Sequence, residues 1–161
     1  MTYRAPVRDH VFILRDVLNL DSYSNLPGFA DAQMETVEQI LEEGARFAEG
    51  VLAPLNGVGD KQGCTWSPDN TVATPDGFKD AYRQLVDAGW PSLSSDPAFG
   101  GQGLPAVINV AFSEMTSSAN MAFGMYPGLT HGAYLAIREG GTDEQKALYC
   151  PKMVSFRWAA P

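Results

Sequence analysis

The chain has 161 residues, which is enough for one domain with a core and too few for two ordinary domains. Its composition, 45% hydrophobic and 19% charged, is typical of a globular protein and excludes a disordered chain. The formal net charge of -8 argues against a nucleic-acid-binding or anionic-membrane-binding surface, because both partners would repel it.

Cysteine usage and hydropathy indicate the cellular compartment and whether a membrane span is expected. Cys64 and Cys150 occur without a metal-binding spacing, and a reduced, cytoplasmic setting is favoured over a disulfide between them. The first residues contain no apolar signal region, so no export signal is expected. Residues 115–137 contain no Asp, Glu, Lys or Arg and are long enough to span a bilayer. Their hydroxyl, amide and imidazole groups favour a buried helix instead, so no membrane span is expected.

The first strong helix is predicted from Asp31, as its N-cap, to Leu52, with Pro54 ending it. Residues 1–30 are expected to be an irregular N-terminal extension with one short apolar element. The helix carries an apolar stripe made of Met34, Val37, Leu41, Ala48, Val51 and Leu52. Its acidic residues lie largely outside that stripe and predict a solvated face: Glu35, Glu38, Glu42 and Glu43.

Residues 55–74 have no clear period and predict a long connection. A helix is then expected with Thr74 as its cap and Pro75 at its first position. After a loop over residues 90–103, a further helix opens at Leu104 and is expected to be central, since Glu114 is its one charge. Glu114 is either a buried acid or, as favoured here, a polar contact to a neighbouring helix end. No alternating strand is predicted, so the fold class is all-α, a bundle of about five to six helices.

The helix that starts near Asn120 is unusual because glycines recur in it every four residues, with a proline among them: Gly124, Pro127, Gly128 and Gly132. Inside a helix these residues cost about 6 kcal/mol in total relative to alanine, so close packing or a ligand must compensate. Close contact with a neighbouring helix is the favoured interpretation from these residues alone. The alternative is the floor of a groove for an apolar ligand, with Met121 and Met125 shaping its walls.

The remaining motifs predict no chemistry by themselves. Gly101–Ala106 matches the dinucleotide pattern G-x-G-x-x-A, but no strand precedes it, and a tight loop leading into the next helix is favoured. His131 has no nucleophile or metal-ligand spacing around it and is expected to be an interior or interface residue. The last helix is predicted over residues 143–155, opened by a capping box at Thr142–Gln145. No catalytic, metal-binding or cofactor-binding residue is assigned.

Two segments together resemble the N-terminal helical domain of the flavin-dependent acyl-CoA dehydrogenases. Asp87–Pro91 followed by Pro97–Leu104 resembles the family's glycine-rich loop between two helices. Glu139–Lys146 followed by Tyr149–Met153 resembles the entry into the last helix of that domain. The two segments occur in the family's order and on the predicted helices, so the resemblance covers about residues 30–158. Tyr3–Leu20 resembles the N-terminal extension of a longer branch that includes the 3-methylmercaptopropionyl-CoA dehydrogenases.

The resemblance implies three segments: an extension over residues 1–30, the helical domain over 31–158 and a tail over 159–161. It implies an acyl-CoA substrate whose α-proton is removed by a glutamate base while the β-hydride passes to FAD. It also implies an electron-transfer flavoprotein as electron acceptor and a homo-oligomeric enzyme of fatty acid metabolism. Finally, it implies that one helix borders the acyl-chain pocket, with room for a bulky acyl group, through Met121, Gly124, Met125, Gly128 and Gly132.

The end of the sequence departs from the family pattern. Relatives usually continue after the last helix into a flavin-binding β-barrel and a C-terminal helical domain. Here Phe156–Pro161 follows instead, and neither the barrel signature nor the base occurs. We therefore expect a fragment truncated before the barrel, inactive and unable to bind FAD alone. The alternative is a stand-alone, non-enzymatic helical interaction module.

Overall fold

The computed structural model describes residues 3–158, except for the side chain of Tyr126, and the expected tail over 159–161 lies outside that range. Its architecture is all-α, as predicted. The helices are α1 (Val7–Phe12), α2 (Met34–Phe47), α3 (Ala53–Gln62), α4 (Phe78–Asp87), α5 (Ala106–Ala119), α6 (Met121–Gly140) and α7 (Asp143–Val154). Short helical turns connect them: η1 (Ile13–Val17), η2 (Leu20–Tyr23), η3 (Ala48–Leu52), η4 (Trp90–Ser92) and η5 (Pro97–Phe99).

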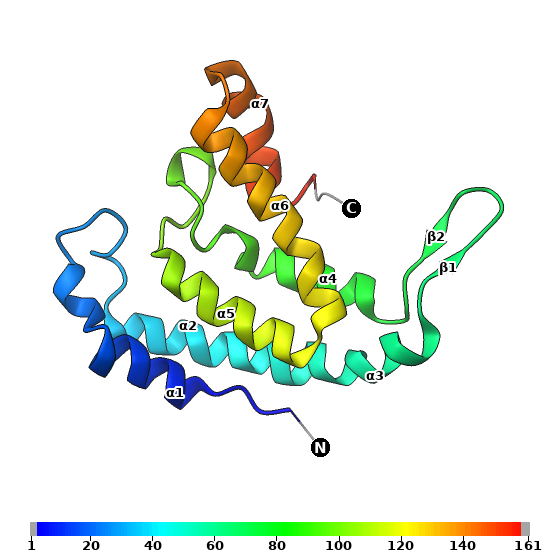
Figure 1. The fold of residues 1–161 in the computed structure, drawn as a ribbon, viewed down its shortest axis with the longest axis horizontal. Helices are drawn as coiled ribbons and strands as arrows, with labels where there is room; N and C mark the ends of the chain where they lie inside the picture. Colours follow the sequence, from blue (N-terminus) through cyan, green and yellow to red (C-terminus); the bar gives the residue numbers. More distant parts are fainter. Residues whose placement is uncertain (1–2, 159–161) are drawn as a thin grey trace.

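Helices α2 and α3 join through η3 into one long rod along the base of the molecule (Figure 1). The rod starts at Met34, not at Asp31, because the carboxylate of Asp21 accepts a hydrogen bond from the Met34 N–H at 3.1 Å and caps the helix from a distant segment. The prediction that Pro54 ends this helix was wrong. Pro54 lies in the first turn of α3, where a missing N–H is tolerated, and the helix runs on to Gln62.

The core lies between the rod and α5, which packs against α2 and α6. The predicted stripe of α2 is buried at Val37 and Leu41, and α5 contributes Ile108 and Met115, all at 0% exposure. The predicted acidic face of α2 is solvated, with Glu42 and Glu43 exposed. Glu114 is exposed as well, so the buried-acid interpretation of this residue was wrong.

The segment predicted as a structureless connection holds the end of α3 and a small hairpin. Strands β1 (Thr65–Trp66) and β2 (Val72–Ala73) pair antiparallel, with Thr65 opposite Ala73, and the hairpin projects away from the helices (Figure 1). The predicted start of the next helix at Thr74 and Pro75 was also wrong. Gly77 adopts a left-handed φ of 81° and its carbonyl accepts the first helical bond of α4, from the Ala81 N–H at 2.9 Å.

The loop before α5 is held together by its own backbone. A side chain at Gly101 would fall on the Ser95 carbonyl, and a Cβ at Gly103 would lie 2.9 Å from the Pro97 ring. The glycines of the G-x-G-x-x-A motif are therefore required by the fold of this loop, as the tight-loop interpretation predicted. The loop leads directly into α5 at Ala106.

Helices α5 and α6 meet at a sharp corner formed by Asn120, which is 1% exposed. Its side-chain oxygen accepts a hydrogen bond from the Phe123 N–H at 3.1 Å, and its amide nitrogen donates to the Leu52 carbonyl in the rod at 3.3 Å. Helix α6 continues through Pro127 to Gly140, and α7 packs against its end. The predicted capping box is confirmed, because the Thr142 and Gln145 side chains bond each other's backbone N–H groups. Within residues 3–158 no helix has both the length and the apolar character needed to cross a bilayer.

Candidate functional site

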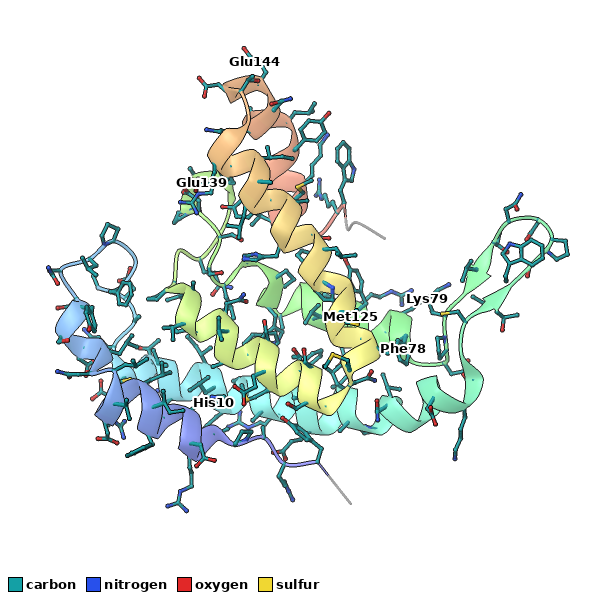
Figure 2. The ribbon with its side chains drawn as sticks, viewed as in Figure 1. His10, Phe78, Lys79, Met125, Glu139 and Glu144 are labelled. Carbon is teal, nitrogen blue, oxygen red and sulfur yellow. The ribbon has the colours of Figure 1, made fainter. Side chains whose placement is uncertain are left out.

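The glycines of α6 form a furrow on the helix surface. Residues four apart lie in inclined rows, so Gly124, Gly128 and Gly132 form one row. One neighbouring row carries Met121 and Met125, which are 58% and 67% exposed. Figure 2 shows Met125 on α6. The furrow therefore opens onto an apolar helix face that has no partner within the described residues.

The three glycines have different surroundings. An ideal Cβ at Gly124 would lie 2.9 Å from the Ser117 hydroxyl oxygen and 3.2 Å from the Ser117 Cα of α5. At Gly128 and Gly132 no described atom outside the helix's own backbone comes within 4 Å of such a Cβ. The close-packing interpretation therefore applies to Gly124, and it explains neither Gly128 nor Gly132.

A small cavity of about 110 Å³ lies where α6 passes α5 and η4. Its apolar lining includes Trp90, Phe112 and Phe123, and the Trp90 and Phe112 rings stack with centroids 4.3 Å apart. Gly124 and Gly128 also line it. Met121, Met125 and Gly132 do not form part of its lining, so the five predicted residues divide between the cavity and the outer face of α6.

Polar groups also line the cavity. Asn109, Ser113, Thr116 and His131 line it, and the Thr116 hydroxyl is occupied by donating to the Ser113 carbonyl at 3.0 Å. Burial lowers the pKa of His131 below its ordinary 6.5, so the imidazole is neutral near pH 7. The cavity therefore combines aromatic walls with uncharged hydrogen-bonding groups.

The histidines and acids of the described chain do not form a metal site or a charge-relay arrangement. Within residues 3–158, no group of His, Cys, Asp and Glu side chains lies close enough to hold a metal ion. His131 is partly buried, with its ring centroid 6.1 Å from that of Tyr134, which agrees with its prediction as an interior residue. His10 is 7% exposed and its Nε2 has no hydrogen-bond partner, but no described cavity includes it.

The cavity beside α6 does not fit a flavin. The cavity of about 110 Å³ is smaller than the ~300–1,000 Å³ of ordinary cofactor and ligand sites. The glycine motif that resembles a phosphate cradle is filled by its own loop, since Gly101 packs against the Ser95 carbonyl. No flavin-dependent step is therefore assigned to residues 3–158.

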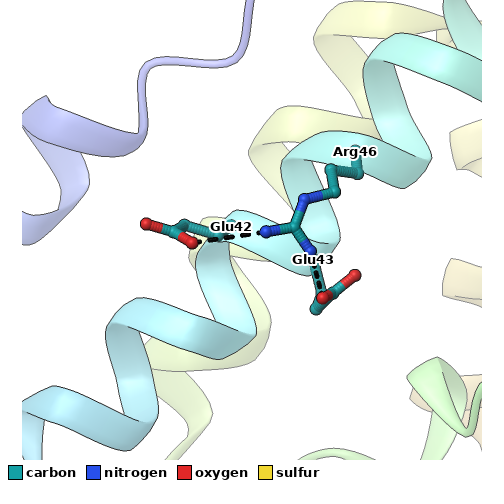
Figure 3. A network of polar contacts seen from close by, with 3 residues as sticks. All are labelled: Glu42, Glu43 and Arg46. Carbon is teal, nitrogen blue, oxygen red and sulfur yellow. Dashed lines mark hydrogen bonds and ion pairs between the residues drawn. The ribbon is translucent and has the colours of Figure 1, made fainter.

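A wider groove lies between α2 and α4, over Phe47, Trp90 and Leu93. Its rim is acidic, with Glu42, Glu43 and Asp87, and Arg46 forms ion pairs with both glutamates (Figure 3). All three members of this network are more than half exposed, so it contributes little to stability. The groove has no cation that is free of an acidic partner.

The sequence did not assign the aromatic lining of the cavity to a site. Trp90 belongs to the Asp87–Pro91 segment that carries the family resemblance, and the sequence assigned Phe112 and Phe123 no role in a site. These side chains come from η4, α5 and α6, so their meeting depends on contacts distant in the sequence. The one available signal was Trp90 in the Gly89–Trp90–Pro91 motif, since large aromatic side chains contribute much of the buried area of a core.

Comparisons with known proteins agree with the helical architecture. The family model described as "Acyl-CoA dehydrogenase, N-terminal domain" matches residues 34–157. The 3-methylmercaptopropionyl-CoA dehydrogenase of Ruegeria pomeroyi is 40% identical over 159 residues, which cover 99% of this chain and 27% of that protein. The broad-specificity linear acyl-CoA dehydrogenase FadE5 of Mycobacterium tuberculosis is 34% identical over 145 residues, covering 89% of this chain and 24% of that protein.

A butyryl-CoA dehydrogenase of Syntrophomonas wolfei is 29% identical over 159 residues and is matched over 26% of its length. The chain thus spans about a quarter of the length of the curated relatives it matches. The family model covers most of the chain and every helix from α2 to α7. The chain belongs to the acyl-CoA dehydrogenase family, as its N-terminal helical domain.

Proposed function

We propose that this chain forms one wall of the acyl-chain pocket of an FAD-dependent acyl-CoA dehydrogenase, which oxidises an acyl-CoA thioester between its α and β carbons. The observation that carries the proposal is the open space over Gly128 and Gly132. A glycine inside a helix costs about 1 kcal/mol relative to alanine, and nothing in the described structure requires that cost at either position. A ligand that needs the room accounts for both.

In this proposal the acyl chain lies along the furrow of α6, between the apolar rows beside it. Met121 and Met125 would contact the chain, because an unbranched thioether adapts to ligands of irregular shape. Gly124 and Gly128 border the aromatic cavity, so the distal end of the chain would point towards Trp90 and Phe112. Burial of the chain against these groups would supply the binding energy and keep water from the pocket.

The remaining machinery would come from outside residues 3–158. The matched relatives are named as dehydrogenases, and the chain spans about a quarter of them, which supports a role as one domain of a larger enzyme. We propose that FAD, the catalytic base, a β-barrel domain and a C-terminal helical domain complete the site. The proposal includes an electron-transfer flavoprotein as acceptor, a homo-oligomer, and a cytoplasmic setting, the last supported by two cysteines that are not joined. Alone, the 161-residue chain would be inactive and free of flavin.

A chimera tests this function. The chain replaces the aligned N-terminal part of the Ruegeria pomeroyi relative, which is 40% identical over 159 residues. Flavin absorbance and reduction of an artificial electron acceptor by acyl-CoA substrates are then measured on the purified protein. Flavin binding together with acyl-CoA-dependent turnover supports the proposal, whereas a folded chimera that binds FAD and shows no turnover with any acyl-CoA contradicts it.

The second candidate is a non-enzymatic helical interaction module. One observation favours it: Met121, Met125 and Leu129 are 58% to 67% exposed on one face of α6, a surface that ordinarily meets a partner. The two functions differ in the chimera. A module would not restore turnover there, and it would remain monodisperse and stable as the isolated 161-residue chain.

A further inference from the structure

A third hollow lies at the junction of α3, α4 and α6, on the side where the hairpin leaves the helices. Its volume of about 630 Å³ falls in the ~300–1,000 Å³ range of small-molecule sites. Figure 2 shows Phe78 and Lys79, which lie on α4 and line it. We call this hollow the α4 groove.

The floor of the α4 groove is apolar and aromatic. Phe78 and Phe123 lie on it with ring centroids 6.1 Å apart, and Tyr82 extends it along α4. Phe123 is 5% exposed and also lines the cavity at the α5 crossing, so its ring lies between the two spaces. The other lining residues differ, and the α4 groove is therefore separate from the proposed acyl pocket.

The charged side chains lining the α4 groove are both cationic, although the chain as a whole has a net charge of -8. Lys79 and Arg83 are four residues apart on α4 and thus lie on the same side of that helix. Lys79 is exposed and forms no ion pair within residues 3–158. Arg83 meets Asp80 at 3.0 Å, but both side chains are 72% exposed, so this pair is weak and readily exchanged.

Asp76, three residues before Lys79 in the sequence, is already engaged. Gln62 donates to the Asp76 carboxylate at 3.0 Å and accepts from the Asp76 N–H at 2.9 Å. Asp76 is not part of the groove lining. The α4 groove thus combines an apolar floor with two available cations, whereas the groove between α2 and α4 has an acidic rim.

We propose that the α4 groove binds an amphiphilic carboxylate of the medium-chain fatty acid type. The hydrocarbon chain covers Phe78 and Phe123, and the carboxylate lies between the Lys79 ammonium and the Arg83 guanidinium. Neither part suffices alone, since the cations are exposed and the floor has no polar specificity. The inference stands apart from the dehydrogenase function and does not depend on it.

Calorimetric titration of the 161-residue chain with decanoate, decan-1-ol, decyltrimethylammonium and acetate tests the site, at concentrations below micelle formation. Decanoate is expected to bind, with decanol weaker and acetate and the cationic amphiphile not binding. The variant Lys79→Glu/Arg83→Glu is expected to weaken decanoate binding by at least about tenfold, because two charge-assisted contacts are lost. It should also bind decyltrimethylammonium.

The matched control is Arg8→Glu/Lys146→Glu, which changes the net charge by the same amount away from the groove. Its decanoate affinity should stay within twofold. A second readout is the reaction of the exposed Cys64 thiol, at the groove edge, with a bulky maleimide. Decanoate should slow that reaction in the native chain and in the control, but not in the Lys79/Arg83 variant.

Two results would overturn the inference. One is equal binding of decanoate and decyltrimethylammonium by the unaltered chain, which would indicate nonspecific apolar association. The other is decanoate binding that survives the Lys79/Arg83 reversal and is lost in Gly128→Leu, which would assign the ligand to the α6 furrow. A failed chimera with intact decanoate binding would contradict the dehydrogenase proposal and leave this one standing.

Discussion

Gly124 of α6 packs directly against Ser117 of α5, so closely that a methyl group on Gly124 would lie 2.9 Å from the serine hydroxyl oxygen. The same row of α6 carries Gly128 and Gly132, which face open space. One glycine is therefore explained by the fold of this domain, and the other two require an explanation outside it. Their different surroundings predict opposite effects of the same substitution.

Replacing Gly128 or Gly132 by alanine is expected to raise the free energy of unfolding by about 0.5–1 kcal/mol each, because no described atom obstructs the new methyl group and a helical glycine is costly. Gly124→Ala should lower it by about 1–3 kcal/mol, since the new methyl group would lie 3.2 Å from the Ser117 Cα and push α5 and α6 apart. Urea denaturation followed by circular dichroism measures all three. Equal effects at Gly124 and Gly128 would show that the two glycines do not differ in packing.

Asn120→Ala is expected to lower the free energy of unfolding by about 2 kcal/mol. The substitution removes the cap on the Phe123 N–H and the bond that ties the α5–α6 corner to the Leu52 carbonyl. Asn56→Ala, at an exposed position of α3, is the control and should change stability little. Chemical denaturation of both variants tests the role of the corner. Similar free energies of unfolding for the two variants would disprove that role.

The free energy of unfolding should fall as the pH drops below 6.5, and His131 should account for part of that fall. Burial holds the pKa of this imidazole below its ordinary 6.5 in the folded chain. Between the lowered pKa of the folded chain and 6.5, the unfolded chain binds more protons than the folded chain, so acid favours unfolding. The contribution of the neutral His131 to stability is fully present above pH 6.5. His131→Gln should reduce the loss of stability between pH 7.5 and 5.5. Parallel urea titrations of both proteins would refute the assignment if the two losses were the same.

The two thiols should differ strongly in reactivity. Cys64 is exposed in the loop after α3, whereas Cys150 of α7 is fully buried, and burial raises the pKa of its thiol. Native protein is expected to consume one equivalent of a thiol reagent quickly, and the second only after unfolding. Cys64→Ser should abolish the fast phase. Rapid labelling of that variant would mean that α7 does not pack as described.

Local signals in the sequence were sufficient for the helices that carry their own end markers. The Thr142 capping box is an example, because both of its hydrogen bonds join residues three apart. Pro54 gave a wrong prediction because its local sequence is ambiguous. A proline can end one helix or lie in the first turn of the next, and the sequence alone does not distinguish the two. The start of α2 was missed because its cap, Asp21, comes from thirteen residues before Met34.

The candidate site was predictable only in outline. The glycine period of α6 indicated that something lies close to the helix, but not that Gly124 meets Ser117 while Gly128 meets nothing. The cavity beside them needs Trp90 from η4 and Phe112 from α5, which the chain brings together by folding. Periodicity within one helix contains no information about such partners.

The claim that α6 borders the acyl chain is tested most directly by the chain-length preference of the chimera after Gly128 is replaced by leucine. The quantity measured is the ratio of kcat/KM for dodecanoyl-CoA to kcat/KM for butanoyl-CoA. In Gly128→Leu this ratio should fall by at least about tenfold, because the new side chain would occupy space proposed for several methylene groups. Ala147→Leu, on the exposed surface of α7, adds a comparable side chain elsewhere and should leave the ratio unchanged. An unaltered ratio in a folded, active Gly128→Leu chimera would contradict the claim that the open side of α6 borders the acyl chain.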